Sequence, residues 1–194
     1  MLLEETYEPG NPTYAGTGLL VVLSGCSGGG KSTLINEMAR RGYPVQIEAG
    51  RQIVKEQRQI GGDGLPWMNT QKFVDLTISR AMLQFNLAAP TRHPVLFDRS
   101  LVDLLPFFER DGMSMPPDLE KAAAIYRYAS RVFFLPPWEE IFRSEPERPK
   151  SFTEAVAEVG ALERMYRKLG YSLVEVPKMP VDDRADFLEE SLTK

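Results

Sequence analysis

The chain has 194 residues, of which 43% are hydrophobic and 26% charged, as is ordinary for one globular domain with a sizeable core. Its formal net charge of −4 argues against a dedicated nucleic-acid-binding protein. One cysteine and one histidine exclude an internal disulfide and a Cys/His zinc site, and they favour a reducing, cytoplasmic location.

The first residues differ in composition from the rest of the chain. Residues 1–16 are acidic and interrupted by proline and glycine, and they lack the basic start and apolar centre of a signal peptide. No apolar run approaches the roughly 20 residues that cross a bilayer. We therefore expect an N-terminal extension over 1–16, a single domain over 17–194, and no membrane partner.

Short apolar runs and longer helical stretches alternate from residue 19 onward. The runs that we predict to be strands lie at 19–23, 43–47, 94–97, 132–135 and 172–176. Alternation of this kind is typical of an α/β fold, in which helices cover both faces of a parallel sheet.

Two helical stretches between these runs have an apolar face. Near 70–88 that face is predicted to hold Phe73, Leu76, Leu83 and Leu87. Near 152–169 it is predicted to hold Phe152, Ala155, Val156, Val159, Leu162, Tyr166 and Leu169. Ser151 and Glu154 are spaced as a capping box at the start of the second helix, and Gly170 is suited to end it.

The most specific motif is LSGCSGGGKST, which follows the first predicted strand. Residues 25–32 fit G-x-x-x-x-G-K-[ST], in which glycines let backbone N–H groups face phosphate oxygens and the next helix points its positive end at them. We expect Lys31 to reach the outer phosphates and Ser32 to bind Mg²⁺. The predicted nucleotide-binding residues are Gly25, Cys26, Ser27, Gly28, Gly29, Gly30, Lys31, Ser32 and Thr33.

Cys26 has two interpretations within this loop. A thiol near a helix N-terminus can have a lowered pKa and be reactive. Alternatively, Cys26 fills a variable position of the motif, and this second interpretation is favoured.

Acidic residues end two of the predicted strands, where ligands of open α/β sheets bind. Asp98 follows the run 94–97 and is expected to hold Mg²⁺ or to act in catalysis; the alternative is that it only caps the next helix. Arg99 either binds the substrate or pairs with an acid. Glu48 follows the second run and would take a proton from an acceptor hydroxyl, or it would form a salt bridge with Arg51.

The segment 136–150 after the fourth strand is rich in proline and charge. Arg143, Arg148 and Lys150 are expected to close over the nucleotide as a lid near 136–150. The alternative is a solvated turn whose arginines pair with its own glutamates. The aromatic residues Trp67, Phe73, Phe107 and Phe108 either line an acceptor pocket or, as helical spacing favours, belong to the core.

Taken in order, these segments resemble the P-loop kinase-like NTPases, and more narrowly the AAA-type predicted ATPase/kinase family that includes ribosylnicotinamide kinase domains. The similar segments are LSGCSGGGKSTLI, IEAGRQIV, VLFDRSLVD, ERPKSFTEA, YRKLGYSLVEVP and VDDRADFLEES. The resemblance implies a three-layer P-loop NTPase fold with a five-stranded parallel sheet of order 2-3-1-4-5 and a small lid. It also implies that Glu48, Arg51 and Arg99 face the phosphate acceptor and that Arg143 and Arg148 belong to the lid.

The resulting expectation is a kinase that uses ATP and Mg²⁺ to phosphorylate a hydroxyl of a nucleoside-like or other small polar metabolite. Glu48 or Asp98 would be the base, with Lys31, Arg143 and Arg148 stabilising charge. The alternative is a regulatory NTPase switch without a small-molecule acceptor. No N-K-x-D or T-K-x-D segment favours a GTPase, and Arg99 rather than an acid after Asp98 disfavours an AAA+ motor. The chain is expected to be a monomer or a homodimer.

Overall fold

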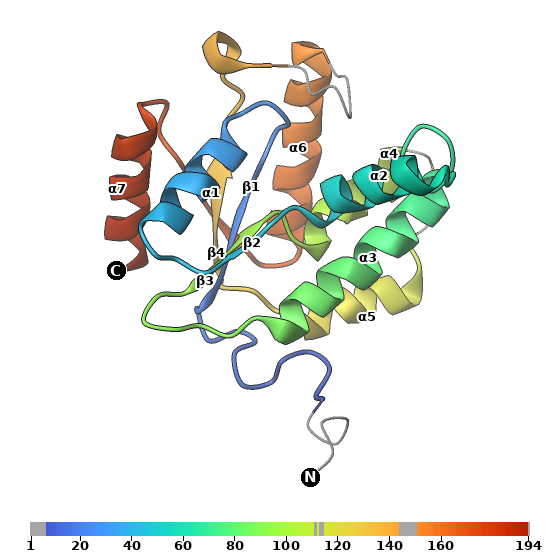
Figure 1. Ribbon diagram of the computed structural model, residues 1–194, viewed down its shortest axis with the longest axis horizontal. Coiled ribbons are helices and arrows are strands. Elements are labelled where there is room, and N and C mark those ends of the chain that lie inside the picture. The colour runs from blue at the N-terminus through green and yellow to red at the C-terminus, as the bar shows by residue number, and fades with distance from the viewer. Residues whose placement is uncertain (1–6, 111, 113–114, 144–150, 194) are drawn as a thin grey trace.

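The computed structural model describes residues 7–110, 112, 115–143 and 151–193 (Figure 1). The strands are β1 (Leu20–Gly25), β2 (Val45–Gln46), β3 (Val95–Asp98), β4 (Arg131–Leu135) and β5 (Ser172–Glu175). The α-helices are α1 (Lys31–Arg40), α2 (Ala49–Ile60), α3 (Thr70–Leu87), α4 (Leu105–Arg110), α5 (Pro117–Ile125), α6 (Phe152–Lys168) and α7 (Val181–Leu192). Two 3₁₀ turns, η2 (Leu101–Leu104) and η3 (Glu139–Ile141), follow β3 and β4.

The five strands form one parallel sheet in the order β2-β3-β1-β4-β5, which confirms the expected fold class and strand order. The central strand β1 is paired on one side with β3, so that Leu23 lies beside Asp98. On its other side Gly25 lies beside Leu135 of β4. The carboxyl ends of β1, β3 and β4 therefore meet at one edge of the sheet, where the phosphate loop begins.

Helices cover both faces of the sheet because side chains of β1 alternate between two buried clusters. Val21 and Leu23 pack in one cluster with residues of α1 and α7. Leu20 and Val22 pack in the other with residues of α2, α3, α5 and α6. This alternation produces the three layers visible in Figure 1, with α1 and α7 on one side of the strands.

The helix α6 begins as its sequence predicts. The Ser151 hydroxyl accepts a hydrogen bond from the Glu154 N–H, and the Glu154 carboxylate accepts one from the Ser151 N–H. Its predicted apolar face is largely buried, with the exception of Val156, which is exposed.

The apolar face predicted for α3 is wrong in its second half. Leu83 and Leu87 are exposed, whereas the buried stripe consists of Phe73, Val74, Thr77, Ala81 and Phe85. The polar residue of this stripe is tolerated because the Thr77 hydroxyl donates a hydrogen bond to the Phe73 carbonyl, 2.7 Å away.

The described part of the N-terminal segment is attached to the end of α3. The Asn11 side chain donates hydrogen bonds to the carbonyls of Phe85 and Ala88. Among the residues that the structure describes, no helix combines the length and apolar character needed to cross a membrane.

Candidate active site at the carboxyl edge of the sheet

The phosphate loop connects β1 to α1, and its first glycine is required by the packing of β1 against β4. Gly25 has φ of 126°, and a Cβ atom at this position would lie 2.2 Å from the Leu135 carbonyl oxygen. At the other end Gly30 is the N-cap of α1, in the left-handed conformation with φ of 81°. The glycines thus bring the loop backbone close to β4 and turn it into α1.

Lys31 is buried at the start of α1 and folds back over the loop. Its Nζ donates hydrogen bonds to the carbonyls of Cys26, at 2.6 Å, and Gly25, at 3.2 Å. Burial, followed by the nearby Arg99 charge, lowers the pKa of Lys31 below its ordinary value. An anion in the loop would therefore favour the charged form of this amine.

Cys26 is fully buried within the loop. Burial raises the pKa of its thiol, and this effect exceeds the opposing effect of Lys31. The environment supports the interpretation of Cys26 as a packing residue rather than a reactive thiol.

Ser32 and Asp98 line the same small cavity, of about 220 Å³, together with Glu48, Arg51 and Lys55. The Asp98 carboxyl is buried, and burial raises its pKa to about 6. Its Oδ1 atom has no hydrogen-bond partner among the described residues. A buried carboxylate oxygen without a partner, next to an exposed hydroxyl, fits a Mg²⁺ ion, which prefers oxygen ligands.

Arg99 lies at the centre of a cluster of acids. Its Nε is 3.6 Å from Glu48 Oε1, its Nη1 is 3.2 Å from Asp103 Oδ1, and its Nη2 is 3.2 Å from Glu158 Oε1. The backbone of Arg99 is left-handed, with φ of 69°, a conformation that costs free energy in a non-glycine residue. Arg99 therefore pairs with acids, which is one of the two interpretations that the sequence left open. It also lines the larger cavity of this region.

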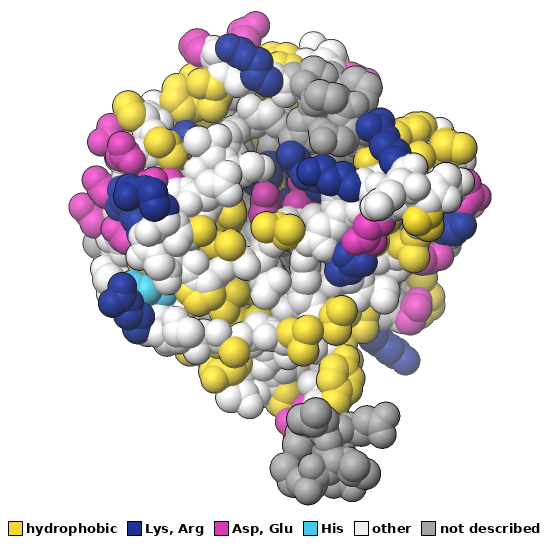
Figure 2. All heavy atoms as spheres, viewed as in Figure 1, with side chains coloured by type: hydrophobic (Ala, Val, Ile, Leu, Met, Phe, Trp, Pro, Cys, Tyr) yellow, Lys and Arg dark blue, Asp and Glu magenta, His cyan; other side chains and the backbone are white. Residues whose placement is uncertain are grey.

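A cavity of about 580 Å³ opens beside Asp98 and is lined from α2, α3, η2 and α6. Trp67, Phe73 and Phe107 form part of its wall, while Phe108 is buried and does not line it. Phe73 also belongs to the buried core cluster and Phe107 packs against it, so both interpretations apply to these two residues, whereas Trp67 is exposed. Figure 2 shows acidic and basic side chains together in a hollow at the middle of the molecule's visible face.

Glu48 connects this larger cavity with the smaller one. It is the N-cap of α2, it is buried, and it lines both cavities. Its Oε2 lies 3.6 Å from Arg51 Nε, so the predicted salt bridge within this turn is present. Glu48, Arg51, Asp98 and Arg99 are therefore brought to one place, as the sequence predicts.

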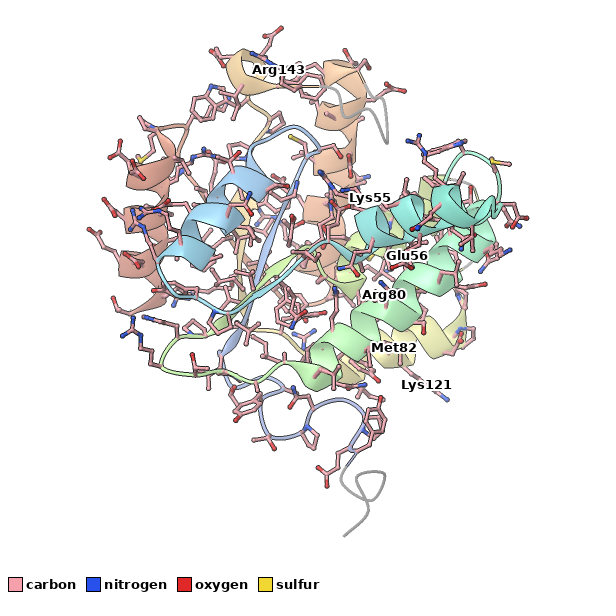
Figure 3. All side chains as sticks on the ribbon, in the orientation of Figure 1. Lys55, Glu56, Arg80, Met82, Lys121 and Arg143 are labelled. Carbon is pink, nitrogen blue, oxygen red and sulfur yellow. The ribbon has the colours of Figure 1, made fainter. Side chains whose placement is uncertain are left out.

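Of the three predicted lid residues, the structure describes Arg143. Arg143 is exposed, and its Nη1 donates a hydrogen bond to the carbonyl of the preceding Phe142. In Figure 3 it lies on the outer part of the segment that follows β4, away from the sheet. Arg148 and Lys150 lie outside the described residues.

Sequence reasoning missed three residues of this region. Asp103 and Glu158 pair with Arg99, and Arg184 lies beside the phosphate loop. The spacing of Ser100 and Asp103 was a usable signal, since these residues form a capping box at η2. Glu158 and Arg184 had no local signal, because their positions depend on the packing of α6 and α7.

A family model and a solved structure match this chain. A family model described as an AAA domain matches residues 20–184. A search of curated proteins gives no match. Among solved structures, deoxyadenosine kinase from M. mycoides with bound dATP aligns at 15% identity and a TM-score of 0.49, over 90% of this chain and 99% of that chain. The family match extends from β1 into α7 and includes the phosphate loop, as the resemblance of the sequence motifs predicts, and the chain therefore belongs to this AAA domain family.

Proposed function

We propose that the protein is a kinase that transfers the γ-phosphoryl group of ATP to a hydroxyl of a small, nucleoside-like metabolite. The observation that supports this most is the pair of cavities that share Glu48 and Asp98. The smaller lies beside Ser32 of the phosphate loop, and the larger has the size of a small-molecule site. Donor and acceptor would meet at these two carboxylates.

On the donor side, the loop residues 25–33 would hold the polyphosphate through backbone N–H groups and the N-terminus of α1. Bound Mg-nucleotide would supply the phosphoryl group, and its metal ion would neutralise charge on the phosphate oxygens. Lys31 would place its ammonium group on the outer phosphates. Ser32 and Asp98 would hold the metal ion through the Ser32 hydroxyl and the unpartnered Asp98 oxygen.

Glu48 is the better candidate for the base. Asp98 is assigned to the metal ion, whereas Glu48 lies at the junction of the cavities, within 3.6 Å of two arginine side chains. An acceptor hydroxyl in the larger cavity would come within reach of this carboxylate and transfer its proton to it. Arg51 and Arg99 would orient the acceptor and Glu48 rather than take part in proton transfer.

The larger cavity indicates the class of acceptor. Trp67, Phe73 and Phe107 offer apolar ring faces suited to a flat base, whereas Glu48, Asp98 and Arg99 offer polar groups suited to a sugar. A nucleoside-like molecule combines both features.

The predicted lid would act on the donor side. Arg143 is exposed in this structure, and Arg143 and Arg148 would approach the donor when the lid closes.

The alternative function, a nucleotide switch without a small-molecule acceptor, does not require the larger cavity. A switch needs the phosphate loop and a segment that responds to the γ-phosphate. A cavity lined by aromatic and charged side chains beside Asp98 is more useful to an enzyme that binds a second substrate.

The test is ADP production from MgATP, measured with and without a panel of nucleosides and related hydroxyl-bearing metabolites. A kinase gives ADP in proportion to acceptor, together with a phosphorylated product detected by mass spectrometry. Lys31→Ala is expected to lower that rate by a factor of about 100 or more while the circular dichroism spectrum stays that of the wild type. ADP production that ignores every acceptor, or full activity in Lys31→Ala, would contradict the proposal.

A further inference from the structure

Arg184 lies in the first turn of α7, which packs against α1 on the same face of the sheet (Figure 1). Its guanidinium group approaches the phosphate loop at Gly30, where an added Cβ atom would lie 2.8 Å from Arg184 Nη1. The same Cβ would lie 3.0 Å from Ile141 Cδ1. The guanidinium therefore occupies the space that a side chain at position 30 would need, directly beside the N-terminus of α1.

The charge of Arg184 has no counter-charge among the described residues. The residue is 5% exposed, and its Nε atom has no hydrogen-bond partner in that part of the chain. Its guanidinium group lies over the ring of Trp138, whose centroid is 5.6 Å from the guanidinium carbon. Burial lowers the pKa of Arg184 below its ordinary value.

Arg41, at the C-terminal end of α1, also lies between α1 and α7, but its ion pairing differs from that of Arg184. Its guanidinium lies 2.8 Å from Glu37, 2.6 Å from Asp186 and 2.8 Å from Glu189. Arg41, the more exposed of these two arginines, is paired three times, whereas no acid in the described part of the chain pairs with the buried Arg184. Since buried charges in proteins are normally paired, Arg184 is arranged for an anion that binds from outside the chain.

We propose that Arg184 binds a phosphate group of the donor nucleotide, as a second cation that acts together with Lys31. The inference rests on the proposed function in that it requires a nucleotide in the phosphate loop. The amides of the loop and the positive end of α1 attract an anion to the same place, and a guanidinium offers two parallel N–H donors to phosphate oxygens. Trp138 would hold the guanidinium plane in position, as aromatic faces commonly do for arginine.

In this role Arg184 contributes to binding of the phosphate group, and it contributes neither to binding of the nucleotide base nor to folding. Arg184→Met keeps most of the side-chain volume against Trp138 and removes the charge together with the N–H donors. Arg41→Met is the matched control, because it removes the same charge from the other arginine of the α1–α7 contact. Arg184→Lys retains a charge but loses the paired donors.

The experiment is isothermal titration calorimetry of each purified variant with MgATP, adenosine and inorganic phosphate, with melting temperatures recorded with and without MgATP. Arg184→Met is expected to weaken MgATP binding by about 10- to 100-fold. The MgATP affinity of Arg184→Lys is expected to lie between those of Arg184→Met and the wild type. Adenosine affinity is expected to be unchanged, since adenosine lacks phosphate. Arg41→Met is expected to bind MgATP as the wild type does.

The melting temperatures separate binding from folding. Without ligand, Arg184→Met is expected to melt at or above the wild-type temperature, because an unpaired buried charge has been removed. With MgATP, its melting temperature is expected to rise less than that of the wild type. A structural role would instead lower the melting temperature of the ligand-free variant and leave MgATP affinity unaltered.

Several results would overturn the inference, and they are distinct from failure of the proposed function. Wild-type affinity of Arg184→Met for MgATP, alongside loss of affinity in Lys31→Ala, would overturn the role of Arg184 alone. An equal loss of adenosine binding would assign Arg184 to the base and reject the phosphate contact. Binding of inorganic phosphate by the wild type with no binding of MgATP would overturn both this inference and the proposed function.

Discussion

The Tyr166 hydroxyl donates a hydrogen bond to the Asp103 carboxylate at 2.5 Å, in the buried interior next to the candidate active site. The same carboxylate accepts hydrogen bonds from the Ser24 hydroxyl, at 2.6 Å, and from the Ser100 N–H, at 2.8 Å. Asp103 therefore links side chains of β1 and α6 to Arg99, with which it forms an ion pair. The geometry of the larger cavity thus depends on a polar network in the core.

Tyr166→Phe is expected to lower the free energy of unfolding by about 1–3 kcal/mol, because one donor to a buried carboxylate is lost. Urea denaturation followed by circular dichroism measures the change. Tyr126→Phe is the control, since Tyr126 is also buried and its hydroxyl has no hydrogen-bond partner among the described residues. Equal losses in the two variants would contradict a specific role for the hydrogen bond.

Glu48→Gln is expected to lower acceptor-dependent turnover by about 100- to 10,000-fold, because the amide cannot accept the hydroxyl proton. MgATP affinity is expected to remain close to that of the wild type, since the phosphate loop is unchanged. Turnover and calorimetric affinity measured on the same preparation separate the two effects. Loss of MgATP binding with normal turnover at saturating nucleotide would reject Glu48 as the base.

Gly25→Ala is expected to destabilise the fold by about 2–4 kcal/mol, since its methyl group would meet the Leu135 carbonyl and its φ of 126° is strained for alanine. Gly61→Ala is the matched control. Gly61 also has a positive φ, of 67°, but an added Cβ there would have no atom within 4 Å. Its cost is expected to be about 1 kcal/mol. Thermal melts of the two variants that coincide would refute the steric explanation.

Glu37 is predicted to contribute to stability in a pH-dependent way. Hydrogen bonds from Arg40 and Arg41 lower the pKa of its carboxyl from 4.5 to about 2. A lowered carboxyl pKa stabilises the fold above about pH 4.5, and that contribution is lost as the pH falls toward about 2. Glu37→Gln should therefore be less stable than the wild type at about pH 6, with the difference shrinking as acid is added.

Chemical denaturation of both proteins between about pH 6 and pH 3 tests this prediction. The control is Glu140→Gln, which removes an exposed carboxyl for which the described residues offer no ion pair. A difference between wild type and Glu37→Gln that stays constant with pH would argue against the lowered pKa.

The fold could be predicted because its signals are local. Each strand overlaps one of the short runs predicted from the sequence, with ends that differ by no more than two residues, and the capping box at Ser151 places the start of α6. The phosphate loop was predictable because glycine at positions such as 25 and 30 is needed for backbone geometry, which leaves a recognisable pattern. Glu48 and Asp98 were predictable because parallel strands bring their carboxyl ends to one edge.

The residues that could not be predicted depend on tertiary packing. On α3, Thr77 and Ala81 are buried together with Phe73, Val74 and Phe85, while Leu83 and Leu87 are exposed, because the packing of the helix against its neighbours decides which face is covered. Trp67 and Phe107 line a cavity whose walls come from segments far apart in sequence. Arg184 is unusual through its burial without a counter-charge among the residues that the structure describes, which no sequence pattern records.

The acids around Arg99 have a consequence for the product of the proposed reaction. Among the described residues, the larger cavity is lined by five carboxylates, Glu48, Asp98, Asp103, Glu154 and Glu158, and by two guanidinium groups, Arg58 and Arg99. A neutral acceptor enters this surplus of negative charge without repulsion. Under the proposed reaction the product carries a new phosphate, which these carboxylates repel. Release of the product would thereby be assisted, and feedback occupation of the cavity by phosphorylated molecules would be weak.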